Sequence, residues 1–169
     1  MKTGSSFALC LALFLFGGCA TYKIQDAGSP SYANVFVKPI RNDSTFPVLE
    51  ATLTSSIRKA VDETGFISSV NENEADAILE IILQRVNRET LAVQAQDLGR
   101  GRKFELQFNL LCSLYKDGTQ TAAYFANRPL IVRQDIFADS GQVNAEYQAT
   151  PEVSRKIATQ IANLLTDVW

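Results

Sequence analysis

The stretch K-F-E-L-Q-F-N-L-L-C-S-L-Y, from Lys103 to Tyr115, alternates between two kinds of side chain. Every second residue is apolar: Phe104, Leu106, Phe108, Leu110, Cys112 and Leu114. The positions between them are mostly polar. A period of two is that of a β-strand with one buried face. This stretch therefore predicts a long strand that covers a hydrophobic core.

Further strands are predicted on both sides of this one. K-D-G-T follows it and is a hairpin turn signal, so a returning strand is expected from Gln120 to about Val132. The nearly continuous apolar run in Ala75–Val86 predicts a strand buried on both faces, although its residue types also suit a helix. Two shorter strands are expected in Asn34–Ser44 and Phe66–Val70. Pro39 cannot donate a ladder hydrogen bond, which predicts an edge or a strand end near it.

Two helices are predicted from apolar residues spaced three and four apart. The first stripe contains Leu49, Leu53, Ile57, Ala60 and Val61. Pro47 suits the first turn of this helix. Gly65 suits the left-handed conformation that commonly ends a helix. The second helix is expected to open at Thr150-Pro151-Glu152. Its stripe contains Val153, Ile157, Ile161, Leu164, Leu165 and Val168.

This element order predicts an α+β fold in which two helices pack on one face of a mixed, roughly four-stranded β-sheet. The shared core is expected to contain Leu53, Ile57, Phe104, Phe108, Ile157 and Ile161. Residues 33–169 are long enough to form this single domain without disulfide bonds.

The first residues predict export. The apolar run Phe7–Phe16 is shorter than the roughly 20 residues of a membrane-spanning helix, and it suits a secretory signal. It ends in L-F-G-G-C, which resembles the lipobox of bacterial lipoproteins. That resemblance implies removal of residues 1–18 and acylation of Cys19 with chains such as palmitate. An ordinary signal with a chance cysteine is the alternative. Residues 19–32 are polar and turn-rich, which is typical of a tether.

Composition argues against catalysis. The chain contains no histidine, which excludes imidazole metal sites, Ser-His-Asp triads and Cys-His pairs. Its net charge is −2, whereas nucleic-acid-binding domains are typically basic. Cys112 lies within the apolar alternation and is interpreted as a core residue. We therefore expect no enzyme, no metal and no cofactor.

One family shares this arrangement. V-K-P-I-R-N-D-S-T-F-P-V-L-E-A-T-L-T-S-S-I-R-K-A-V-D-E-T-G, Val37–Gly65, resembles the strand, Asn-x-[ST] turn and helix of the lipopolysaccharide-assembly lipoprotein LptE family. E-A-D-A-I-L-E, Glu74–Glu80, is similar to the strand entry that follows in many members. The resemblance covers most of residues 19–169. The mature start C-A-T-Y differs from the usual Cys-Gly-Tyr or Cys-Gly-Trp.

The resemblance implies a function and partners. Such proteins plug the outer-membrane β-barrel translocon LptD, help it assemble and contact lipopolysaccharide on its way to the cell surface. It implies a location at the periplasmic face of the outer membrane, with a lipid anchor at Cys19. Basic residues in D-L-G-R-G-R-K, namely Arg100, Arg102 and Lys103, are candidate contacts for lipopolysaccharide phosphates or for the barrel. A solvated loop is the plainer interpretation of this charge run, and Arg128 and Arg133 are weaker candidates.

Two other classes stay open from the sequence. Lipoproteins that activate peptidoglycan synthases, and the amino-terminal domain of TolB, share a similar opening of strand, helix and Ala-Asp strand. Such a protein would be a lipid-anchored periplasmic interaction domain. A lipid-anchored hydrolase would need a convergent pair of acids.

Overall fold

The computed structural model describes residues 30–46, 50–93, 101–116, 122–138 and 141–167. Several predicted features lie outside these residues: the signal sequence, Cys19 and the tether as far as residue 29, Pro47, Leu49, Arg100, the hairpin turn and Val168.

Six strands form one mixed sheet in the order β3-β1-β4-β5-β6, and β2 pairs with β4 off this path. The strands are β1 (Asn34–Val37), β2 (Arg41–Asn42), β3 (Ser68–Ser69), β4 (Ala77–Val93), β5 (Gly101–Lys116) and β6 (Ala123–Phe137). β1 runs parallel to β3 and β4, and β2 runs parallel to β4. The three long strands β4, β5 and β6 are antiparallel. The prediction of a mixed sheet is confirmed, with six strands where roughly four were expected. The predicted strand segment Asn34–Ser44 forms both β1 and β2, and the predicted segment Phe66–Val70 forms β3.

The long strands follow the predicted patterns. In β5 the side chains from Leu106 to Leu114 alternate, and every second one is almost fully buried. In β4 the neighbouring residues Ile78 and Leu79 are both buried, which confirms a strand covered on both faces there. β6 continues to Phe137, beyond the predicted end at Val132, because Ile136 extends the buried side of the strand.

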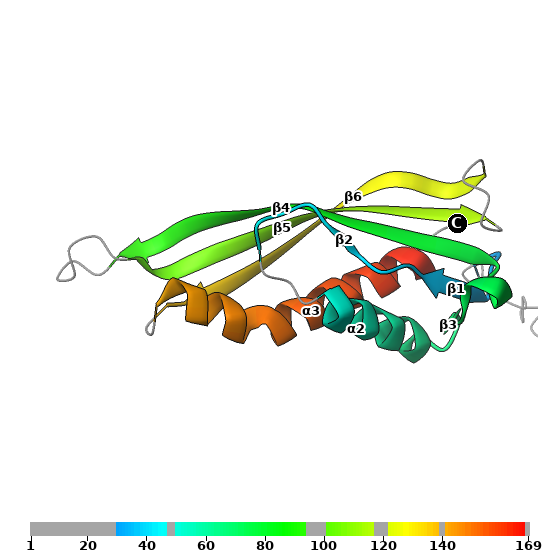
Figure 1. The fold of residues 1–169 in the computed structure, drawn as a ribbon, viewed down its shortest axis with the longest axis horizontal. Coiled ribbons are helices and arrows are strands. Elements are labelled where there is room, and N and C mark those ends of the chain that lie inside the picture. The colour runs from blue at the N-terminus through cyan, green and yellow to red at the C-terminus, as the bar shows by residue number, and fades with distance from the viewer. Residues whose placement is uncertain (1–29, 47–49, 94–100, 117–121, 139–140, 168–169) are drawn as a thin grey trace, which may run out of the picture.

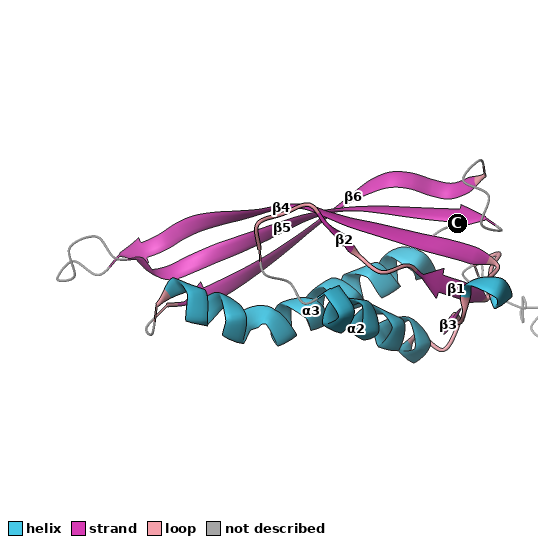
Figure 2. Ribbon diagram, viewed as in Figure 1, coloured by secondary structure: helices cyan, strands magenta, loops and turns pink. Residues whose placement is uncertain are grey.

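Both helices cover the same face of the sheet, as predicted (Figure 2). α2 (Glu50–Glu63) buries Leu53, Ile57 and Val61. Gly65 follows it with φ of +72°, which confirms its predicted left-handed conformation. A short 3-10 turn, η1 (Glu72–Glu74), then leads to β4.

The predicted start of the last helix was wrong. α3 (Gln142–Thr166) begins eight residues before Thr150, so Pro151 lies inside it. Pro151 has no N–H for the carbonyl four residues earlier, which normally disfavours a helix interior. The turns before it are held instead by tertiary contacts, because Ala145, Glu146 and Thr150 are buried.

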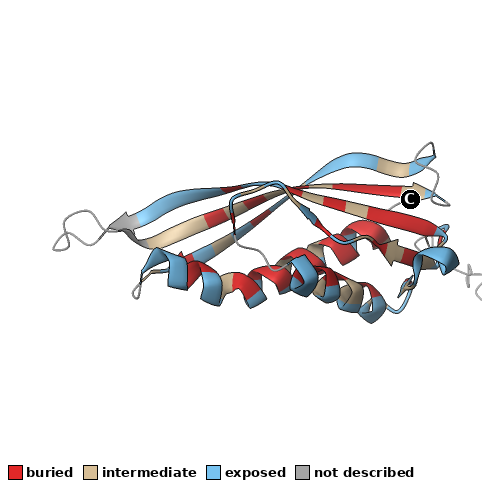
Figure 3. Ribbon diagram, in the orientation of Figure 1, coloured by how far each residue is buried: buried red, intermediate tan, exposed pale blue. Residues whose placement is uncertain are grey.

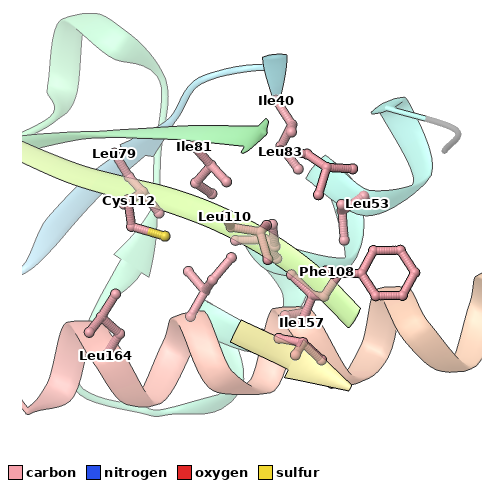
Figure 4. Close-up of a cluster of buried hydrophobic side chains, with 14 of the residues drawn as sticks. Ile40, Leu53, Leu79, Ile81, Leu83, Phe108, Leu110, Cys112, Ile157 and Leu164 are labelled. Carbon is pink, nitrogen blue, oxygen red and sulfur yellow. The ribbon is translucent and has the colours of Figure 1, made fainter. Parts of the chain in front are cut away.

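The core lies between the sheet and the helices (Figures 3 and 4). Leu53, Ile57, Phe108, Ile157 and Ile161 are fully buried, and Phe104 packs against them partly exposed, which confirms the predicted set. The ring of Phe108 meets that of Phe46 edge-on, with centroids 5.1 Å apart. Among the described residues, no helix is long and apolar enough to cross a membrane.

Candidate functional site

The long strands and the start of α3 project to one end of the molecule, which we call the distal end (Figure 1). The chain enters the described fold at Pro30, at the opposite end (Figure 1). Across the distal end, Lys103 of β5 pairs with Ala92 of β4 and with Phe137 of β6. The pairing of the strands therefore places Lys103 at the end of the sheet farthest from the entry of the chain.

Of the three predicted contact residues Arg100, Arg102 and Lys103, Lys103 is the one whose side chain the structure describes. Its Nζ lies 2.7 Å from Oδ2 of Asp135 and 5.8 Å from the ring centroid of Phe137. The side chain is 34% exposed, so the ammonium group is accessible but already partly neutralised. An anionic ligand would compete with Asp135 for it.

The other predicted basic residues do not all gather with Lys103. Arg102 is the second residue of β5, and Arg100 is outside the described residues. Arg133 lies on β6 beside Glu105, with its Nε 3.5 Å from the carboxylate. Arg128 stacks over Phe125 in the opposite half of β6. These two weaker candidates are thus separated from the tip.

A row of carboxylates crosses the same end of the sheet. Glu89, Glu105 and Asp135 face one another on neighbouring strands. Like charges placed directly opposite are destabilising. Arg133 and Lys103 compensate two of the three carboxylates. The distal end is therefore a surface of mixed charge, which the sequence did not predict because the row is assembled from three strands.

Beneath the sheet, a partly buried ion pair fixes the start of α3. Nε and Nη2 of Arg88 lie 2.6 Å and 3.1 Å from the two carboxylate oxygens of Glu146. Gln142 donates a third hydrogen bond to Glu146. Burial alone would raise the pKa of Glu146, but the hydrogen bonds from Arg88 and Gln142 and the charge of Arg88 lower it overall. Glu146 therefore stays ionised, and the helix is clamped to β4.

Exposed apolar side chains gather at this end as well. Leu91, Phe137, Val143 and Tyr147 are all large and exposed, from 46% for Leu91 to 77% for Val143. They come from the ends of β4 and β6 and from the first turns of α3. The distal end therefore offers both charged and apolar groups to a ligand or partner.

The described residues contain no cluster of His, Cys, Asp or Glu that could hold a metal ion. Burial raises the pKa of the Cys112 thiol to about 12, so it stays protonated in the core. This confirms Cys112 as a core residue.

The chain is an α+β domain with two helices on one face of its sheet and with charged and apolar groups at the distal end of that sheet. The sequence model of the LptE family, described as lipopolysaccharide-assembly, matches residues 32–165. The chain therefore belongs to the LptE family of lipopolysaccharide-assembly proteins.

Solved structures have the same fold. Protein XCC0632 from Xanthomonas campestris superposes with a TM-score of 0.59 at 11% identity, over 82% of this chain and 85% of its own. Lipoprotein B from Nitrosomonas europaea gives 0.50 at 14% identity, over 80% and 81%. At these identities the likeness concerns the fold alone. No curated protein matches the chain in sequence.

Proposed function

We propose that this protein is an outer-membrane lipoprotein that plugs an LptD-type β-barrel, helps the barrel assemble and assists the insertion of lipopolysaccharide. The family match over residues 32–165 carries the proposal. The role is one of binding, without a catalysed reaction.

The geometry of the chain supports an anchored plug. Cys19 would carry the lipid, and the described fold begins at Pro30. The residues between them can span at most about 40 Å when fully extended. The entry end of the fold would therefore stay near the periplasmic face of the outer membrane. The distal end would reach away from the anchor, toward the interior of the barrel.

The distal end would meet lipopolysaccharide. The phosphates of lipopolysaccharide are anionic, and Arg100, Arg102 and Lys103 would supply cations for them. The Lys103–Asp135 contact lies at the surface, where such pairs are worth only about 0–1 kcal/mol. A phosphate can therefore displace Asp135 at little cost. The interaction should weaken with salt, since exposed charges are screened.

The proposal is tested by isolating the tagged full-length protein from outer membranes. The expected result is that an LptD-type barrel co-purifies with it. Cys19→Ser should abolish lipid labelling and release the protein from the membrane, whereas Cys112→Ser, the matched control, should leave the labelling intact. Recovery of a peptidoglycan synthase in place of the barrel would favour the periplasmic-activator class. Unchanged labelling in Cys19→Ser would overturn the anchor.

A further inference from the structure

The face of the sheet opposite the helices, which we call the outer face, has no described helix on it (Figures 1 and 2). Its character changes along the strands. Near the entry of the chain, Ile82 of β4 and Pro129 of β6 both flank Leu111 of β5. The next two rows toward the distal end are mostly polar. Asn109 lies between Arg85 and the exposed Ile131, and Gln107 lies between Asn87 and Arg133.

A groove opens where these polar rows begin. β2 pairs with β4 only at Ile82 and Leu83, so the edge of β4 is left open beyond that point. A β-bulge at Gln84 shifts the register there, as bulges often do beside binding sites. The chain after β2 turns away because the Asn42 side chain accepts hydrogen bonds from the N–H and hydroxyl of Ser44. The resulting groove measures about 440 Å³ and is lined by Asp43, Gln84, Arg85, Asn87 and Asn109.

The groove combines preorganised and free hydrogen-bonding groups. The side-chain oxygen of Gln107 accepts a hydrogen bond from Arg133, and its side-chain nitrogen donates one to Asn109. These hydrogen bonds fix the polar side chains beside the groove. Within the described part of the chain, Arg85 and Asn87 make no side-chain hydrogen bond or ion pair that would occupy them. The carboxylate of Asp43 is taken by Arg41, at 3.2 Å. The Arg85 guanidinium is therefore the uncompensated charge of the groove.

These features decide between kinds of occupant. Protein interfaces have apolar and aromatic cores, whereas the lining residues of this groove that the structure describes are all polar or charged. Nucleic acid carries a phosphate at every nucleotide and needs several cations, whereas Arg85 is the single cation among the described lining residues. Amides donate and accept, as sugar hydroxyls do, and a free guanidinium suits a phosphate.

We infer that this groove binds the phosphorylated oligosaccharide of lipopolysaccharide. Amide side chains would exchange hydrogen bonds with the hydroxyls, and Arg85 would hold a phosphate. The inference rests on the proposed function, which supplies lipopolysaccharide as the ligand. It adds a saccharide contact on the outer face, separate from the basic segment at the distal tip.

The test uses the mature, full-length protein and a fully deacylated, phosphorylated core oligosaccharide as the probe. Titration calorimetry should show binding that weakens when the probe is dephosphorylated. The double variant Arg85→Ala/Asn87→Ala should bind at least about tenfold more weakly, since it removes a charged and a neutral hydrogen-bond donor. Lys59→Ala removes a comparable exposed cation from α2 and should bind like the wild type. Both variants alter exposed side chains, and their thermal stability is measured in parallel.

Each outcome is decisive. Undiminished binding by the double variant would overturn the inference that the groove is the binding site. So would equal binding of unphosphorylated peptidoglycan glycan strands, because Arg85 would then have no phosphate to select. If the wild-type protein captures the barrel and intact lipopolysaccharide but not the deacylated probe, the groove is refuted while the proposed function stands. Failure to capture either the barrel or lipopolysaccharide would refute the proposed function itself.

Discussion

Glu146→Ala is expected to be one of the most damaging single substitutions away from the apolar core. The Glu146 side chain is 7% exposed and accepts hydrogen bonds from Arg88 at 2.6 Å and 3.1 Å and from Gln142 at 3.0 Å. Removing it leaves the Arg88 guanidinium, only 30% exposed, without its carboxylate. Loss of one partner of a fully buried pair costs about 3–5 kcal/mol. Because Arg88 keeps some contact with water, we expect about 2–3 kcal/mol.

The assay is urea unfolding of the wild type, Glu146→Ala and the double variant Arg88→Met/Glu146→Leu. Apolar replacement of both partners removes the unpaired charge, so the double variant should be within about 1 kcal/mol of the wild type or more stable. Hydrogen exchange should accelerate in Glu146→Ala over residues 142–150, which the pair clamps to the sheet. A loss below about 1 kcal/mol in Glu146→Ala would refute the reasoning, since the pair would then be solvated.

Four other predictions concern stability and binding. The lowered pKa of Glu146 means that its stabilising contribution is complete above the unfolded value of about 4.3 and is lost as the pH falls through the folded value. Glu146→Gln and the wild type should therefore converge in stability in urea melts as the pH is lowered below the unfolded value. Phe108→Ala should cost about 3–5 kcal/mol in urea unfolding, and less than about 1 kcal/mol would place this side chain outside the core. Gly65→Ala should cost about 1 kcal/mol from backbone strain alone, because a Cβ there meets no neighbour, and a stabilised variant would contradict the positive φ. Replacing Arg100, Arg102 and Lys103 with Glu should weaken lipopolysaccharide binding while stability changes by about 0.5 kcal/mol or less; intact folding with undiminished binding would remove this segment from the site.

The sheet could be predicted because its signal is local. The alternation from Phe104 to Leu114 is contained within one strand, and burial on one face follows from it directly. The helical stripes through Leu53 and Ile157 are equally local. A pattern of apolar side chains was sufficient for these elements.

The first turns of α3 could not be predicted in the same way. Their buried face consists of Ala145, Glu146 and Thr150, which carry no apolar stripe, while Val143 and Tyr147 point to solvent. Because proline is common in the first turn of a helix, Pro151 led to the prediction that the helix begins there. The partner that holds these turns, Arg88, lies 58 residues away in sequence. Tertiary contacts of this kind leave no periodic signal.

The candidate sites show the same limit. The basic segment that includes Lys103 could be found as a contiguous charge run, but its partner Asp135 could not. The groove on the outer face joins Asp43, Arg85 and Asn109, which come from three separate segments. Register and the bulge at Gln84 bring them together, and neither is visible in the sequence.

The most direct test of the plug is site-specific photo-crosslinking in living cells from two sides of the molecule. Ile131 pairs with Asn109 on the outer face of the sheet and is 49% exposed. Tyr147 lies on α3, the helix on the other face, and is 66% exposed. A domain enclosed by a barrel should crosslink to LptD from both positions. A crosslink from one position only would indicate docking on the outside of a partner, and crosslinks to a peptidoglycan synthase from either position would contradict the account.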